Sequence, residues 1–503
     1  MPYGRKNNET HKEYKKRVID CKSASFCGAK WYNATIWLGH GQTASCHHPP
    51  AHNIDITELK SNPSAIHNTK HKKLMRKYMQ EGTRPKECEY CWKVEDIEKG
   101  NISDRVYKTE IYSDDDLQKA YDMPWDNNVN LRTLEISFDR TCQFACSYCN
   151  PAFSTTWVKD IDSKGPYKNI QSDGRGHFID NAPWSKPLPE GQNPYIDAFF
   201  KWWETDLHRT LEELRITGGE PLMSPNTWKL FDWFEENADK SNVRFAINSN
   251  LGGSQNLIDR LIEKSHNIPN FQVFTSCEAF GKDAEFIRDG LKFEYWRKNI
   301  RRLITEGKLE QLNMMMTING LCLLSMDTFL DYLMELKKEF GPQYPMFTVN
   351  LLRFPSFQSP LTLPKEIKEE RADCFEKWIE KNKGLANKDG WNYLQDFEID
   401  QLQRLIDYLR GVDTPHMFTA ERPKLLNDFK EFYLQYSKRR GFDFHKIFGY
   451  RKDFIEWFDN IELLSNTGMG KRSTGESVAD YDDPDVKEPR GWNTTVDKLG
   501  SKK

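Results

Sequence analysis

Two kinds of hydrophobic pattern alternate between residues 131 and 355. Short apolar runs rich in β-branched and aromatic residues predict strands, and longer segments with apolar residues every three or four positions predict amphipathic helices. The predicted strands are residues 132–138, 211–217, 243–249, 271–277, 312–318 and 346–352. The predicted helices between them are residues 198–210, 226–238, 256–265, 293–307 and 326–340.

This alternation of strands and helices predicts the α/β class, with a parallel sheet built from β/α units. Six such units suit either an open, partial (β/α)6 barrel or a doubly wound sheet. In both architectures ligands bind at the carboxyl ends of the strands. Polar residues that directly follow a predicted strand are therefore the first candidates for a functional site.

The regions around this core have different compositions. Residues 1–110 are rich in Cys and His, residues 365–460 predict a helical extension, and the polar tail 473–503 is expected to be disordered. Residues 161–195 interrupt the strand–helix rhythm with many Gly, Pro, Asn and Asp residues. A loop of this length is either a functional lid or a passive insertion, and the sequence leaves both open.

Composition excludes some classes of protein. The formal net charge is −3, so there is no overall basic field for nucleic acid or an anionic membrane. The basic stretch 70–86 has apolar residues at helical spacing and predicts a solvated amphipathic helix rather than a nucleic-acid contact. No apolar run is long enough for a transmembrane helix, and the polar N-terminus lacks the apolar core of a signal peptide. We expect a cytoplasmic location.

Eleven cysteines in a chain without an export signal favour reduced thiols, some of them bound to metal. Cys142, Cys146 and Cys149 follow the first predicted strand with the spacing Cys-x3-Cys-x2-Cys. Buried apolar thiols are an alternative, but this loop also contains Gln and Ser. Structural zinc usually takes four ligands. Three thiolates with one open position suit a [4Fe–4S] cluster better.

A second signal lies after the next predicted strand, in the stretch RITGGEPLMSP. Gly218 and Gly219 lack Cβ atoms, which lets the backbone approach another group closely. Glu220 offers a carboxylate to an ammonium group, and Pro221 follows it. Alone, this stretch reads as a tight turn. One β/α unit after the cysteine loop, it indicates a ligand site.

Together the cysteine loop, with Tyr148 before Cys149, and the GGE stretch resemble the radical S-adenosylmethionine (SAM) superfamily over residues 131–355. The resemblance implies that Cys142, Cys146 and Cys149 hold three irons of a [4Fe–4S] cluster, and that SAM chelates the fourth. The reduced cluster would cleave SAM to a 5′-deoxyadenosyl radical, which takes hydrogen from a substrate.

The resemblance also implies which residues contact SAM. Gly218, Gly219 and Glu220, with Pro221, would receive its methionine amine. Further contacts are expected at later strand ends, and a structural polar role is an equal alternative for each. These further candidates are Asn248, Asn250, Ser276, Glu278 and Arg353.

A second set of cysteines precedes the predicted barrel: Cys27, Cys46, Cys88 and Cys91. Chemistry alone makes tetrahedral zinc the default for four cysteines, with His47, His48 or His52 as substitute ligands. The segment resembles the twitch domain, a short form of the SPASM domain found in radical SAM enzymes, here of a type seen in phage and environmental proteins. That resemblance favours an auxiliary [4Fe–4S] cluster over zinc.

The function expected from these resemblances is a radical SAM enzyme that depends on a reductant such as flavodoxin or ferredoxin. A peptide is the first substrate expected, because twitch-bearing relatives often modify peptides. Small-molecule, nucleotide or sugar chemistry is the alternative. A non-enzymatic, zinc-stabilised nucleic-acid-binding protein is the rival of another class, in which the GGEP stretch has no role.

Overall fold

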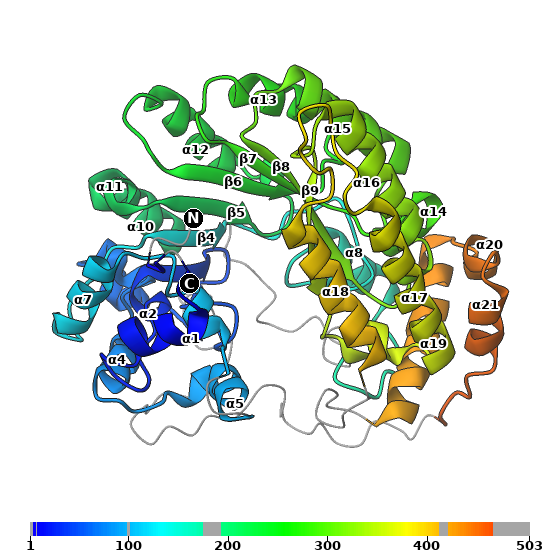
Figure 1. Ribbon diagram of the computed structural model, residues 1–503, viewed down its shortest axis with the longest axis horizontal. Helices are drawn as coiled ribbons and strands as arrows, with labels where there is room; N and C mark the ends of the chain where they lie inside the picture. The colour runs from blue at the N-terminus through cyan, green and yellow to red at the C-terminus, as the bar shows by residue number, and fades with distance from the viewer. Residues whose placement is uncertain (1–3, 7, 98–100, 175–192, 412–420, 466–503) are drawn as a thin grey trace.

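The computed structural model describes residues 4–6, 8–97, 101–174, 193–411 and 421–465. In these residues nine strands form one open sheet in the order β3-β2-β1-β4-β5-β6-β7-β8-β9. All six predicted strands are present, as the last six in that order (Figure 1). Their bounds are β4 Thr133–Ser137, β5 Glu213–Thr217, β6 Arg244–Ser249, β7 Gln272–Ser276, β8 Gln311–Ile318 and β9 Met346–Leu351.

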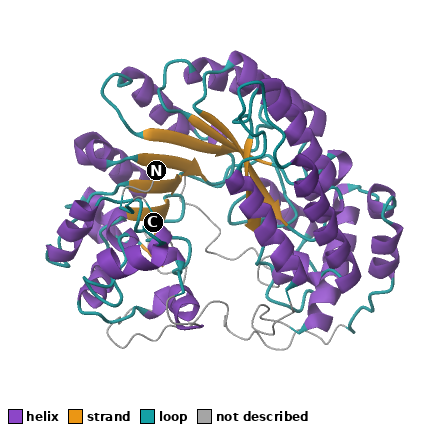
Figure 2. Ribbon diagram, viewed as in Figure 1, coloured by secondary structure: helices purple, strands orange, loops and turns teal. Residues whose placement is uncertain are grey.

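These six strands are parallel to their neighbours, as the strand–helix alternation predicted. Helices connect them and lie along the outer side of the sheet (Figures 1 and 2). The helices of this region are α8 Thr155–Lys164, α10 Pro194–Trp202, α11 His208–Thr210, α12 Pro225–Glu236, α13 Gln255–Ser265, α14 Gly281–Ile287, α15 Phe293–Glu306 and α16 Met326–Phe340.

The two faces of the sheet differ because side chains alternate along each strand. Leu134, Ile136, Leu214 and Ile216 are buried in the main hydrophobic core. The alternate positions of the same two strands carry polar groups that remain partly accessible, such as Glu135 and Arg215. One face of the sheet therefore packs under helices, and the other presents charged and polar side chains.

The N-terminal region extends this sheet. Strand β1, Asn33–Trp37, pairs parallel with β4, and β2, Gln42–Ala44, and β3, His52–Asn53, continue antiparallel. A second apolar cluster, which includes Phe26, Trp31 and Trp92, lies within this region. The helices here are α1 His11–Tyr14, α2 Ala29–Tyr32, α3 Ile56–Leu59, α4 Lys70–Gln80, α5 Glu89–Ile97, α6 Asp104–Tyr107 and α7 Asp114–Asp122.

Helix α4 confirms the predicted helix in the basic stretch, but its basic residues do not all face solvent. Lys72 and Arg76 are buried. Lys72 donates to Thr43 and to the carbonyl of Ala44, and Arg76 donates to Asn68, so the buried cations keep hydrogen-bond partners. This basic helix is part of the N-terminal interior.

Helices also form the predicted C-terminal region: α17 Lys365–Asn382, α18 Asp396–Arg410, α19 Arg422–Arg440, α20 Phe444–Phe448 and α21 Lys452–Asp459. The first part of the predicted insertion lies against α19, where Asp428 accepts from the backbone of Gln171 and Ser172. The rest of the insertion from 175 to 192 and the tail 473–503 lie outside the described residues. Among the described helices, none is both long and apolar enough to cross a bilayer.

Candidate metal and cofactor site

The predicted cysteine loop begins where β4 ends, at the carboxyl edge of the sheet. Burial raises the pKa of Cys142 well above its ordinary value, and the neighbouring thiols of Cys146 and Cys149 add to this effect. Burial likewise raises the pKa of Cys146 to about 11 and that of Cys149 to about 12. The structure thus brings the three sulfurs together in a largely desolvated position, where thiols stay protonated unless a metal takes the proton's place.

The spacing of these sulfurs bears on the kind of metal they can hold. Ligands of one tetrahedral zinc, with Zn–S of about 2.3 Å, lie about 3.8 Å apart. Among the described residues, no three cysteine sulfurs lie within 4.8 Å of one another. A cluster of several irons, each holding one sulfur, needs a wider arrangement than a single ion does. As described, the three sulfurs are not close enough together to be the ligands of one tetrahedral zinc ion.

Three hydrogen-bond donors lie near the sulfurs. The backbone N–H of Phe144 and the Nδ2 of Asn250 lie 3.4 and 3.8 Å from Cys142 Sγ. Arg288 Nη1 lies 3.9 Å from Cys146 Sγ. Donors of this kind stabilise metal-bound thiolates and tune an iron–sulfur cluster.

Arg288 is held by a buried ion pair with Glu278. Its Nη2 lies 2.6 Å from Glu278 Oε2, and the two side chains are only 6% and 1% exposed. Glu278 also accepts from the hydroxyl of Tyr148, at 3.2 Å, and the guanidinium lies 5.5 Å from the Tyr148 ring centroid. Glu278, predicted as a SAM contact, therefore fastens the cysteine loop to the end of β7. A SAM contact for Glu278 stays a prediction.

The two glycines of the GGEP stretch are required by the cysteine loop itself. A Cβ on Gly219 would lie 2.3 Å from the carbonyl oxygen of Thr141, and one on Gly218 would lie 2.5 Å from Ser137 Oγ. Gly218 also has a φ of +116°, which L side chains rarely adopt. The backbone N–H of Glu220 donates to Thr141 O at 2.7 Å. The missing Cβ atoms let the two loops touch.

Glu220 is buried and links the ends of β5 and β6. Its carboxylate accepts from Ser249 Oγ and from the backbone N–H of Asn250, both at 2.7 Å, and from Leu222 N at 3.1 Å. Burial raises the pKa of Glu220 to about 7 in spite of these hydrogen bonds. A buried carboxylate in this state gains from a cationic partner such as an ammonium group.

The other predicted SAM contacts differ in their surroundings. Asn248 carries a buried Oδ1 with no hydrogen-bond partner in the described structure, and a SAM contact for it stays a prediction. Asn250 accepts from Gln143 and approaches Cys142, so it belongs to the cysteine loop. Ser276 is the last residue of β7. Arg353 is exposed, and its guanidinium lies 5.6 Å from the ring centroid of Tyr90 in the N-terminal region.

The four N-terminal cysteines also come together in space. Burial is the main cause that raises the pKa of Cys46, Cys88 and Cys91, and in each case the nearby thiol of Cys27 adds to it. Cys46 has the same effect on Cys88 and Cys91. Four cysteines from three separate stretches of sequence thus lie near one another, and we call them the four-cysteine group.

A buried cation accompanies the four-cysteine group. Burial lowers the pKa of the Lys30 amine, but the negative charges of Cys88 and Glu87 raise it by more, so the pKa lies above its ordinary value. Lys30 forms an ion pair with Glu87, and both side chains are buried. A fixed ammonium beside several thiolates offsets the negative charge that a metal cluster with four cysteine ligands carries.

Sequence reasoning missed Arg288, Lys30 and Ser249. Arg288 lies ten positions beyond Glu278, after α14, and no spacing motif connects the two. Lys30 stands in a short AKWY helix that lacks a charge pattern. Ser249 was the only one with a signal, since it ends a predicted strand next to Asn248 and Asn250.

Comparisons with known proteins add distant likenesses only. No family model matches the chain, and no curated protein matches it in sequence. The solved structure of anSMEcpe with bound AdoMet and Cp18Cys peptide is 12% identical, with 65% of this chain and 99% of that one covered and a TM-score of 0.30.

Two structures of Streptococcus suis SuiB are similarly distant, each at 12% identity and a TM-score of 0.33. The match to SuiB bound to S-adenosylmethionine covers 61% of this chain and 62% of the SuiB chain. The match to SuiB bound to precursor peptide SuiA covers 72% of this chain and 71% of the SuiB chain. Likenesses at this level establish neither a common fold nor a common activity.

Proposed function

We propose that the chain is a radical SAM enzyme in which Cys142, Cys146 and Cys149 hold three irons of a [4Fe–4S] cluster. The observation that carries this proposal is the contact between the cysteine loop and the GGEP stretch. Gly219 and Glu220 pack backbone to backbone on Thr141, beside the three sulfurs. This contact supports the proposal because it brings a buried carboxylate close to three cysteines, which would leave one iron of the proposed cluster without a protein ligand.

The residues present fit such a cluster with SAM on its fourth iron. The sulfurs are desolvated and have nearby donors from Phe144, Asn250 and Arg288. The orphaned Oδ1 of Asn248 lies one strand end away from Glu220, whose own carboxylate is bound to Ser249 and Asn250. Polar groups of this kind suit a ligand that carries both an ammonium and hydroxyl groups.

Each part of the site has a role in this proposal. Glu220 attracts the methionine ammonium of SAM, and Gly218 and Gly219 keep the loop close enough for that contact. Asn248, Asn250, Ser276 and Arg353 are the further contacts we propose. When bound, the reduced cluster and SAM supply a carbon radical that removes a hydrogen atom from the substrate. Arg288 and Glu278 hold the cysteine loop in place.

For the four-cysteine group we propose an auxiliary [4Fe–4S] cluster, with Cys27, Cys46, Cys88 and Cys91 as its ligands. Four ligands leave no iron free, so the cluster would carry electrons rather than bind the substrate. The charge of Lys30 supports this assignment. A peptide substrate, a flavodoxin- or ferredoxin-like reductant and a cytoplasmic location, in the host cell if the protein is virus-encoded, complete the proposal.

Anaerobic reconstitution of the full chain tests the proposal. We expect about eight irons per chain, four for each cluster, and a brown protein. After reduction it should convert SAM to 5′-deoxyadenosine. A colourless protein that holds tightly bound zinc, or a protein with full iron content that leaves SAM intact, would overturn it.

A further inference from the structure

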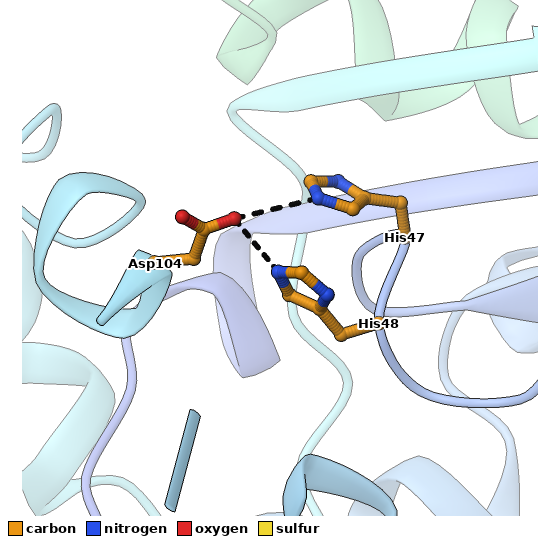
Figure 3. Close-up of side chains that lie close together, drawn as sticks. All are labelled: His47, His48 and Asp104. Atoms are coloured by element: carbon orange, nitrogen blue, oxygen red, sulfur yellow. Dashed lines mark hydrogen bonds and ion pairs between the residues drawn. The ribbon is translucent and has the colours of Figure 1, made fainter. Parts of the chain in front are cut away.

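His47, His48 and Asp104 form a compact cluster of side chains that the proposed reaction does not use (Figure 3). His47 and His48 follow Cys46 after β2, and Asp104 is the first residue of α6. The Nε2 atoms of His47 and His48 lie 3.4 and 2.7 Å from Asp104 Oδ2. One ligand atom from each of the three residues lies within 4.8 Å of the other two.

One of these side chains is held in place by packing, and the backbone of a second is fixed at the start of a helix. His48 is only 11% exposed, and its ring stacks on Tyr90 with centroids 4.0 Å apart and planes at 14°. Asp104 begins a helix that is capped by the side chain of Ser103. His47 is 62% exposed, so one ligand remains reachable from solvent. The cluster is therefore largely preorganised and still open to an incoming ion.

The three ligand atoms are separate from the sulfurs of the four-cysteine group, although His47 follows Cys46 in sequence and the backbone N–H of His48 donates to the Cys46 sulfur. In the described part of the chain, no cysteine sulfur joins the three ligand atoms within the 4.8 Å limit. The donor set is two imidazoles and one carboxylate. Zinc and other divalent transition metals take these ligands, and three protein ligands leave a position for water or a substrate group.

We propose that His47, His48 and Asp104 bind a single divalent transition metal ion, with zinc as the representative ion, and leave one coordination position open. The inference is independent of the proposed radical chemistry, because it uses none of the cysteines.

The position of the site is consistent with a role near the substrate. Burial raises the pKa of Glu135 on β4. Arg215 and, to a smaller extent, His47 lower this pKa, so His47 lies near Glu135. On the other side, Tyr90 stacks on His48 and contacts Arg353, which follows β9. These contacts connect the site to β4 and to the residues that follow β9, the first and the last of the six consecutive parallel strands.

Zinc binding to the full-length reconstituted protein tests this inference. Competition with a chromogenic chelator should detect one bound zinc per chain in the wild type. The variants His47→Ala and Asp104→Asn should bind this zinc at least about tenfold more weakly. Zinc K-edge absorption should show only nitrogen and oxygen ligands, near 2.0–2.2 Å, because iron in the clusters does not absorb at this edge.

The exposed pair of His445 and Asp459, 2.8 Å apart, provides a matched control. His445→Ala should leave zinc affinity unchanged. Equal zinc affinity in the wild type, His47→Ala and Asp104→Asn would overturn the inference, and so would sulfur ligands at about 2.3 Å or the absence of bound zinc. A thermal melt of each variant verifies that a lost site does not reflect a lost fold. If a single variant unfolds, the spectrum of the wild type still decides between nitrogen–oxygen and sulfur ligation.

Discussion

The chain carries two groups of cysteines that are built in opposite ways. Cys142, Cys146 and Cys149 belong to one loop after one strand, and that loop rests on the backbone of Gly219 and Glu220. The four-cysteine group draws Cys27, Cys46, Cys88 and Cys91 from stretches that only the folded N-terminal region brings together. The first group depends on local spacing, and the second depends on tertiary structure.

The charged and polar side chains next to the two cysteine groups also differ. Near the three cysteines lies the buried carboxylate of Glu220, and Asn248 on the adjacent strand β6 has an amide oxygen without a hydrogen-bond partner in the described structure. Beside the four cysteines lies Lys30, already paired with Glu87. The three-cysteine site also has a paired neighbour, the Arg288–Glu278 ion pair, so the difference lies in Glu220, whose buried carboxylate has no cationic partner in the described structure. A SAM site at the first group alone is part of our proposal.

Removal of one ligand from the first group should have the largest effect. We expect Cys142→Ala to reduce 5′-deoxyadenosine formation by more than about a hundredfold, since even the loss of a residue that only hydrogen-bonds to a metal ligand costs about 10–100-fold. The iron content should fall from about eight to about four atoms per chain. Retention of SAM cleavage in this variant would break the distinction between the two groups.

The reciprocal change is Cys88→Ala in the four-cysteine group. We expect a similar loss of about four irons, but SAM cleavage within a few fold of wild type, because the radical-forming site is intact. Iron analysis and a 5′-deoxyadenosine assay on the same sample check this. If SAM cleavage disappears while four irons remain, the two sites are not independent.

Gly219→Ala tests the contact between the two loops without changing a proposed metal ligand. The new methyl group would lie 2.3 Å from Thr141 O, a backbone atom that cannot move without the cysteine loop. We expect a loss of about 1–3 kcal/mol in unfolding free energy and poor retention of the first cluster. Gly320→Ala is the control, since its nearest neighbour lies at 3.4 Å. Equal urea midpoints for the two variants would contradict the proposed contact.

The pair of Arg288 and Glu278 should set the properties of the first cluster. In Arg288→Gln/Glu278→Gln the donor near Cys146 is lost without an unpaired buried charge. We expect the reduction potential of this cluster to fall on the order of tens of millivolts, measured by a redox titration with electron paramagnetic resonance.

Lys337 and Glu398 form another fully buried ion pair, with Nζ and Oε2 2.9 Å apart, and serve as the control. The double change Lys337→Gln/Glu398→Gln should alter stability and leave the potential unchanged. A shift of the same size in both double variants would show that Arg288 has no specific effect on the cluster.

The pH dependence of stability should report on the proton of Glu220. Its folded pKa, about 7, lies above the ordinary value of 4.5. Between these values the folded protein binds more protons than the unfolded chain, so this group's contribution to stability falls as pH rises, by at most about 1.4 kcal/mol per pH unit. Glu220→Gln should remove that slope, as urea midpoints at pH 5 and 8 can show. Parallel pH profiles for both proteins would contradict the raised pKa.

Much of the parallel sheet could be predicted from the sequence, because each strand there is a short apolar run between helices of clear periodicity. The cysteine loop and Glu220 could be predicted as well, since their residues lie at the ends of two of those strands. Asn248 and Asn250 follow the same rule.

Other features depend on contacts that no local pattern encodes. The place of strand β1 beside β4 is set by pairing with a segment about a hundred positions away, which no local pattern indicates. Arg288 meets Glu278 only because α14 folds back on the sheet. Lys72 and Arg76 have the charge pattern of a solvated helix, but hydrogen bonds to Thr43, Ala44 and Asn68 allow their burial.

The central claim is that SAM docks on the iron that the three-cysteine loop leaves free. Electron–nuclear double resonance of the reduced Cys88→Ala protein, with SAM labelled with nitrogen-15 at its amine, tests this most directly. We predict a hyperfine coupling between the cluster and the labelled nitrogen, absent from Cys142→Ala. A complete four-iron cluster in the Cys88→Ala protein that shows no coupling to the amine of SAM would contradict the account.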